Sequence, residues 1–293
     1  MTQSLVEVHG LTKHYGDIRA VDGLDLQVAE GEVYGFLGPN GSGKSTTILM
    51  LLGMAEPTAG TVSVAGHDPT RNPTEVKRHV GYLPESVGFY GDLTGRRNLM
   101  YTAELNSIPR AQAEARVSDL LEMVQLTDAA HRPVGQYSRG MRQRLGLADV
   151  LLKEPKLVIL DDPTLGLDPA GIQWLLGLIE EMSSQRNIAV FLSSHQLHEV
   201  QRVCHRVGIM SRGKLVLEGT VSDLTSQHEG GGHEVRIEME QVTPALPDAL
   251  SAIAGVTSCA IEGNTVVVAS TTDVRAQASA VSFAQGGGVL EVR

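Results

Sequence analysis

The fold is decided by a short glycine-rich stretch, Gly38-Pro39-Asn40-Gly41-Ser42-Gly43-Lys44-Ser45-Thr46. It matches the pattern GxxxxGK[ST], in which a loop joins a strand to a helix. An apolar strand is expected before it, over Val33 to Leu37, and a helix is expected to begin near Gly43. A glycine-rich turn without a ligand is the alternative, and these flanking elements argue against it. The sequence therefore predicts an α/β fold with a phosphate-binding loop.

Each residue type in this loop suits a triphosphate. Glycines allow the backbone N–H groups to turn inward around phosphates, and the start of the helix adds its positive end. Lys44 is expected to reach the β- and γ-phosphates, and the Ser45 hydroxyl is expected to ligate Mg²⁺. All nine residues from Gly38 to Thr46 are therefore candidate ATP-binding residues.

A second half of the site is expected from a strand further along the chain. The apolar run Leu157 to Leu160 predicts a buried strand that ends in Asp161. The carboxyl end of such a strand is where α/β sheets bind ligands, so Asp161 is expected to hold the metal, usually through water. Many strands end in an acidic residue by chance, and it is the spacing from the phosphate loop that favours a functional reading.

The remaining sequence predicts a large α/β domain with a helical insert and a small domain behind it. Short strands dominate the first 84 residues, interrupted by one helix after Gly43, and the pattern is helical from about 85 to 152. Asp168-Pro169 begins a further helix, a buried strand follows over Ile188 to Leu192, and Arg206 to Glu218 predicts a hairpin. The large domain is expected to span 1–225.

A glycine-rich linker is expected over 226–232, because three consecutive glycines end a stretch without periodicity. Beyond it, residues 233–293 predict strands at 233–239, 256–261, 265–269 and 288–292, with helices at 245–254 and 272–283. This βαββαβ order is typical of a ferredoxin-like α+β domain.

Composition excludes several classes of function. The 24 Lys and Arg residues against 34 Asp and Glu give a net charge of −10, which argues against binding to nucleic acid. Cys204 and Cys259 are the only cysteines, and their spacing suggests neither a disulfide framework nor a zinc site. A metal site at His195, His198 and His205 is not expected either, because no carboxylate or thiol stands at ligand spacing from them.

No apolar run approaches the ~18 residues that span a bilayer. If the chain serves a membrane process, another chain is expected to cross the membrane.

The segment Tyr137-Ser138-Arg139-Gly140-Met141-Arg142-Gln143-Arg144 resembles the LSGGQ signature of ABC ATPases. The same family order places Tyr15 in the aromatic A-loop, Glu85 in the Q-loop, Asp168 in the D-loop and His195 as the switch histidine. The resemblance covers roughly residues 4 to 225. It implies a P-loop ABC ATPase core with a helical subdomain over about 85–152.

The resemblance also implies how nucleotide would be held. Two ATP molecules would be sandwiched between two subunits, in a homodimer or a heterodimer. Ser138, Gly140 and Gln143 would contact the ATP that the other subunit holds, and Asp168, in the D-loop, is a further candidate ATP-binding residue. Tyr15 would stack on the adenine, with a partly buried loop tyrosine as the alternative reading.

Catalysis would rest on residues that flank this nucleotide. Asp162 occupies the position where the family usually has a glutamate that polarises the attacking water, so its reach is shorter by one methylene. His195 would contact the γ-phosphate, and Glu85, in place of the usual glutamine, would join Ser45 and Asp161 at the metal. ATP binding and dimerisation are expected to persist with Asp162, whereas turnover depends on how well the shorter carboxylate is placed.

Three segments are similar to those of the branch whose partners are ABC-2-type exporter permeases: GYLPE at 81–85, the signature, and GLDP at 166–169. This implies a motor subunit at the cytoplasmic face of the membrane, bound there through the permease. Ser86 to Asn98, with Phe89 and Tyr90, would receive the permease. Two alternatives remain: a degenerate, ATP-holding subunit of a heterodimer, and a soluble ABC ATPase that works without a permease.

Overall fold

The computed structural model describes residues 4–195, 201–221, 223, 233–239, 242–243, 246–270, 274, 277–278, 281–282 and 289–292. The chain divides into two compact units, Met1–Thr220 and Val221–Arg293. The expected linker at 226–232 lies outside the described residues. No helix in the described ranges is long and apolar enough to cross a membrane.

The centre of the first unit is a six-stranded sheet with the order β5-β6-β7-β3-β8-β9. Five strands are parallel and the edge strand β9 is antiparallel to β8. The strands are β3 (Val33–Leu37), β5 (Val80–Leu83), β6 (Leu157–Asp161), β7 (Ala189–Ser194), β8 (Arg206–Ser211) and β9 (Lys214–Thr220). Every residue of β3, β6 and β7 is buried, which explains the apolar runs Val33–Leu37, Leu157–Leu160 and Ala189–Leu192 in these strands.

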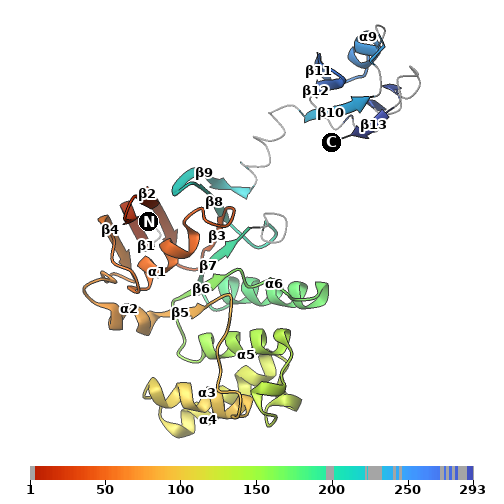
Figure 1. Cartoon of the computed structure of the whole chain (residues 1–293). Helices are drawn as coiled ribbons and strands as arrows, with labels where there is room; N and C mark the ends of the chain where they lie inside the picture. Colours follow the sequence, from red (N-terminus) through yellow and green to blue (C-terminus); the bar gives the residue numbers. More distant parts are fainter. Residues whose placement is uncertain are drawn as a thin grey trace. The chain divides into compact units, whose positions relative to one another are not determined.

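A separate antiparallel sheet, in the order β2-β1-β4, packs beside the first. Its strands are β1 (Ser4–Tyr15), β2 (Ile18–Ala29) and β4 (Ala59–Val64). Helix α1 (Lys44–Leu51) shares one hydrophobic core with both sheets. Figure 1 shows these strands, in red and orange, beside α1 and β3. The sequence patterns indicated the strands, but not their division between two sheets.

The expected helical insert is present. It consists of α3 (Gly95–Leu105), α4 (Arg110–Met123), the 3₁₀ turns η1 (Thr127–Ala129) and η2 (Val134–Gln136), and α5 (Arg139–Leu151). Figure 1 shows α3, α4 and α5 grouped on one side of the large sheet. Helix α6 (Pro169–Ser184) follows β6, with Asp168 as its N-cap and Pro169 in its first turn.

One expectation for the first 84 residues was wrong. A second helix, α2 (Pro73–His79), follows β4, whereas the pattern predicted only the helix after Gly43. Val76 is its only buried residue, so a seven-residue helix with one core contact carries no apolar periodicity.

The second unit contains a four-stranded antiparallel sheet in the order β11-β12-β10-β13. Its elements are β10 (His233–Met239), α9 (Leu246–Ser251), β11 (Val256–Glu262), β12 (Thr265–Ser270) and β13 (Val289–Val292). Numbered within the unit, this sheet order is 2-3-1-4, as a ferredoxin-like βαββαβ chain requires. Of the expected helix at 272–283, the structure describes only parts, and residues 277, 278, 281 and 282 are helical.

Candidate nucleotide-binding site

The phosphate loop leaves β3 and ends at the first turn of α1. Lys44 is 5% exposed, and its Nζ donates to the carbonyl oxygens of Gly38 at 2.7 Å and Pro39 at 3.3 Å. The ammonium group is thus held inside the loop by the loop's own backbone. Gly43 has a φ of 110°, and a Cβ there would collide with the carbonyl oxygen of Ala20. The loop therefore needs glycine at this position for both conformation and space.

A cavity of about 470 Å³ opens above this loop. Nine of the residues predicted from the sequence line it: Tyr15, Asn40, Gly41, Gly43, Lys44, Ser45, Thr46, Glu85 and Asp162. Gly38, Pro39 and Ser42 belong to the same loop but are not part of this lining. The Ser42 hydroxyl is buried and has no hydrogen-bond partner among the described residues. A loop of backbone N–H groups with an unused hydroxyl and a buried ammonium group fits a polyanion such as a triphosphate.

Four further residues line the cavity without having been predicted: Ile18, Arg19, Ala20 and Arg212. The first three begin strand β2, and the β8–β9 turn supplies Arg212. The β8–β9 turn connects β2 to the phosphate loop, since Gly213 N donates to Ser42 O at 2.9 Å and Asp22 N, in β2, donates to Gly213 O at 2.8 Å. Tyr15 is 48% exposed beside them, with Lys13 Nζ 5.0 Å from its ring centroid. The family resemblance placed Tyr15 at this site, but no sequence signal placed Arg212 there, because only sheet pairing brings the β8–β9 turn to the loop.

Asp161 ends β6 at the same edge of the sheet and is 8% exposed. Burial raises the pKa of its carboxyl group, the charges of Asp162 and Glu85 add to the rise, and Lys44 opposes it. These charges act on one another because the carboxyl ends of β5 and β6 adjoin the phosphate loop. Ser45, Asp161 and Glu85 together offer oxygen ligands of the kind that Mg²⁺ prefers.

The raised pKa of Asp161 predicts a gain in stability when its charge is removed. Because this pKa is higher in the folded chain than in the unfolded chain, the ionised carboxylate destabilises the fold at any pH above the folded-state pKa. The destabilisation disappears when the pH is below the unfolded-state pKa, about 3.8. Asp161→Asn is therefore expected to raise the unfolding midpoint of the nucleotide-free chain at neutral pH, by an amount that shrinks on acidification. Thermal unfolding across pH measures this, with Asp17→Asn in the exposed β1–β2 turn as control. Equal midpoints for Asp161→Asn and wild type at neutral pH would contradict it.

Asp162 and His195 form a pair at the ends of neighbouring strands. Asp162 Oδ1 lies 2.8 Å from His195 Nδ1, and Asp162 N donates to Ser193 O at 3.1 Å. The φ of Asp162 is 45°, in the left-handed region, which aspartate tolerates better than most residues. The chain therefore turns sharply after β6, and His195 holds the carboxylate in one orientation.

The signature residues lie apart from this cavity. Ser138 is the N-cap of α5 and accepts a hydrogen bond from Met141 N at 3.2 Å. Asp168 accepts from Gly171 N at 3.0 Å at the start of α6. Gln143 is 6% exposed and donates to Pro163 O at 3.2 Å. Neither these residues nor Gly140 is part of the cavity lining, so one chain brings together only half of the predicted site.

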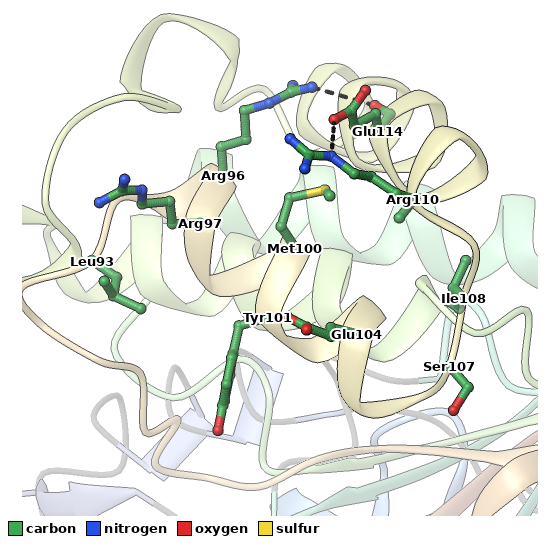
Figure 2. Close-up of a pocket in the computed structure, with 11 residues that line it drawn as sticks. Leu93, Arg96, Arg97, Met100, Tyr101, Glu104, Ser107, Ile108, Arg110 and Glu114 are labelled. Atoms are coloured by element: carbon green, nitrogen blue, oxygen red, sulfur yellow. Dashed lines mark hydrogen bonds and ion pairs between the residues drawn. The ribbon is translucent and has the colours of Figure 1, made fainter.

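A second cavity, of about 770 Å³, lies between α3 and α4. Figure 2 shows Arg96, Met100 and Arg110 between the two helices, with Glu114 bonded to Arg110. Arg110 Nε donates to Glu114 Oε1 at 2.9 Å, and Arg96 Nη1 donates to Ser118 Oγ at 3.0 Å. Its lining is completed by Leu93, Arg97, Tyr101, Glu104, Ser107, Ile108 and Ala113. We call this cavity the α3–α4 groove.

Residues 21–165 match the family model described as ABC transporter. The chain is 43% identical to the bacitracin transport ATP-binding protein BcrA of Bacillus licheniformis, over 73% of this chain and 69% of that protein. It is 37% identical to the daunorubicin/doxorubicin resistance ATP-binding protein DrrA of Streptomyces peucetius, over 86% and 76% of the two chains. That second match spans 252 residues, more than the 220 of the first unit, so the similarity extends into the second unit.

A solved structure has the same fold as the first unit. It is a dimeric ATP-binding cassette in a post-hydrolysis state bound to ADP and Pi, with a TM-score of 0.67 and 23% identity, over 74% of this chain and 98% of that one. The fold, the phosphate loop and these similarities agree. The chain belongs to the ABC transporter family, as one of its ATP-binding proteins.

Proposed function

We propose that this chain is the ATP-hydrolysing motor subunit of an exporter, that it closes with a second ATP-binding subunit around two ATP molecules, and that it drives a separate permease. The main observation behind the proposal is that one chain contains only part of the predicted nucleotide-binding site. The cavity has its phosphate loop, carboxylates and aromatic residue, while Ser138 and Gly140 of the same chain lie outside it. A signature helix from a second subunit would complete it.

In this proposal the nine residues from Gly38 to Thr46 hold the phosphates, and Tyr15 stacks on the adenine. Ser45, Asp161 and Glu85 hold Mg²⁺, which when bound neutralises developing charge on the phosphates. Asp162 orients the attacking water and accepts its proton, and His195 fixes the direction of that carboxylate. The pair distance of 2.8 Å supports these roles. Asp168 lies at the subunit interface.

The decisive measurement is steady-state phosphate release from ATP·Mg²⁺ across chain concentrations. A two-subunit site predicts a rate that rises with the square of concentration while monomers dominate. Two variants sharpen the result: Lys44→Ala disables the phosphate loop, and Ser138→Arg blocks the signature. Each alone is expected to be inactive, and their mixture is expected to regain activity, because a mixed dimer contains one site made of two intact halves.

The outcomes separate the alternatives. A rate per chain that does not depend on concentration, with no recovery in the mixture, would exclude a self-pairing ATPase. Binding of ATP without phosphate release would favour the degenerate, ATP-holding subunit of a heterodimer. The observation that favours this alternative is that the side chain of Asp162 is one methylene shorter than the glutamate usual at this position.

The α3–α4 groove supports the position of the permease in this proposal. It begins within Ser86 to Asn98, the segment expected to receive the permease, and combines apolar and basic side chains. Tyr90 and Tyr101 meet edge to face at 5.3 Å beside it and are 59% and 40% exposed. In the part of the chain that the structure describes, Arg97 forms no ion pair. Exposed tyrosines and an unpaired arginine are typical of protein interfaces.

Met100→Asp in this groove is expected to abolish co-purification with an ABC-2-type permease from detergent-solubilised membranes, because it replaces an apolar contact with a carboxylate beside the groove's arginines. Mass spectrometry of the recovered membrane protein is the measurement. Val216→Asp, at an exposed position of β9, is the matched control. The isolated chain's phosphate release is expected to be the same in both variants. If wild type recovers no permease, the soluble ABC ATPase becomes the better reading.

A further inference from the structure

Helix α5 touches the loop that carries the proposed catalytic carboxylate. We call residues 162–167, between β6 and α6, the 162–167 loop. The buried amide of Gln143 donates to the carbonyl oxygen of Pro163 at 3.2 Å. Pro163 is bonded directly to Asp162, so this hydrogen bond acts one peptide away from the carboxylate. Leaving a buried carbonyl without a donor is unfavourable, so this hydrogen bond restrains the position of Pro163.

Two more contacts join the start of α5 to the far end of this loop. A Cβ on Gly166 would lie 2.7 Å from Arg139 Nε and 2.8 Å from its Cζ, so the Arg139 side chain crosses directly over that glycine. A Cβ on Gly140 would lie 3.6 Å from Leu167 Cδ2. Three positions of one helix, 139, 140 and 143, therefore contact the loop at Gly166, Leu167 and Pro163.

We propose that Gln143 is a positioning residue for catalysis: it fixes Asp162 through the Pro163 carbonyl and ties it to the signature helix of the same chain. The inference rests on the proposed function and assigns Gln143 a role different from the nucleotide contact expected from its sequence position. Asp162 has an unusual φ of 45°, so its direction depends on what holds the residues on either side of it. His195 holds the side chain and Gln143 holds the following peptide.

This arrangement links the two proposed ATP sites. Ser138 begins α5 and would contact the ATP of the partner subunit, whereas Gln143, one and a half turns further along the same helix, holds the Asp162 that acts on this chain's own ATP. A helix of 13 residues moves as one body, so closing one site shifts the carboxylate of the other. Arg139, which stands where the family usually has glycine, strengthens the link by packing on Gly166.

The test begins with Gln143→Met, which keeps the volume of the side chain and removes the donor. A misplacement of about 1 Å can cost on the order of 10²-fold in rate, so kcat is expected to fall at least about tenfold, with the Kd for ATP unchanged. Arg144→Leu is the matched control on the same helix. It removes a guanidinium 4.4 Å from the Trp174 ring and a 2.6 Å bond to Gln125, without touching the 162–167 loop. It is expected to lower the unfolding midpoint and to leave kcat unchanged.

The pH dependence of kcat in Gln143→Glu distinguishes loss of the hydrogen bond from a change in packing. An ionised glutamate cannot donate to the Pro163 carbonyl, but its protonated form can. Burial raises the pKa of such a carboxyl above its usual value of about 4.3. The kcat of Gln143→Glu, relative to wild type at each pH, is therefore expected to recover as the pH falls, whereas the ratio for Gln143→Met stays constant.

Hydrogen exchange of the nucleotide-free chain tests the same inference without turnover. Leu165 N donates to Asp162 O at 3.2 Å and Leu167 N to Thr164 O at 3.1 Å within the loop. These amides are expected to exchange faster in Gln143→Met and at the wild-type rate in Arg144→Leu. If wild type releases no phosphate, the proposed function fails and the exchange rates alone decide the inference. Unchanged exchange in Gln143→Met, or equal losses of kcat in Gln143→Met and Arg144→Leu, would overturn it.

Discussion

Asp162→Asn is expected to lower the kcat of phosphate release by on the order of 10²–10⁴-fold, the range by which a positioned general base accelerates a reaction. Asparagine keeps the size of the side chain, and its amide can still meet His195. It cannot accept the proton of the attacking water. Binding of ATP involves the phosphate loop and Tyr15, so the Kd for ATP is expected to stay the same. Single-turnover phosphate release and equilibrium nucleotide binding measure the two quantities.

Two companion variants make this result specific. Asp162 and His195 are 2.8 Å apart and act as a unit, so the double variant Asp162→Asn/His195→Ala is expected to be little slower than Asp162→Asn alone. Additive losses would mean that the two residues act independently. Asp162→Glu restores the family's usual side chain. If only this variant is active, the natural chain is an ATP-holding subunit.

Lys44→Ala is expected to raise the Kd for ATP by roughly tenfold to a hundredfold, since each hydrogen bond to a charged group contributes ~1.5–3 kcal/mol. The ammonium group is buried within the loop at 2.7 Å from Gly38 O, so it is already placed where phosphates would bind. Removing it leaves the loop without its only lysine and with an unmatched carbonyl. Titration with a fluorescent ATP analogue measures the change.

Folding of this variant needs its own control, because Lys44 also bonds the loop. The unfolding midpoint without nucleotide reports loop damage, and the stabilisation by added ATP reports binding. A variant with a wild-type midpoint and no stabilisation by ATP would agree with the prediction. Stabilisation by ATP equal to that of wild type would show that the ammonium group does not hold phosphates.

Local patterns were enough for much of the fold. The loop motif, the apolar runs of β3, β6 and β7, and the N-cap at Asp168 each depend on neighbours in sequence, so their elements were predicted nearly to the residue. Helix α2 was missed because a single buried residue, Val76, leaves no period to detect. In the second unit, strand and turn patterns predicted the βαββ order that β10, α9, β11 and β12 show.

The sequence by itself determined the chemistry of this protein: a phosphate loop, two successive carboxylates after a buried strand, and a signature helix. These are set by residue type and short spacing. Tertiary structure decided which of them meet. Parallel pairing of β6 with β7 brings Asp162 to His195, packing of α5 turns Gln143 toward Pro163, and the signature helix stays away from its own chain's cavity. Such contacts join residues 20 to 33 positions apart, and only the packing of whole elements fixes them.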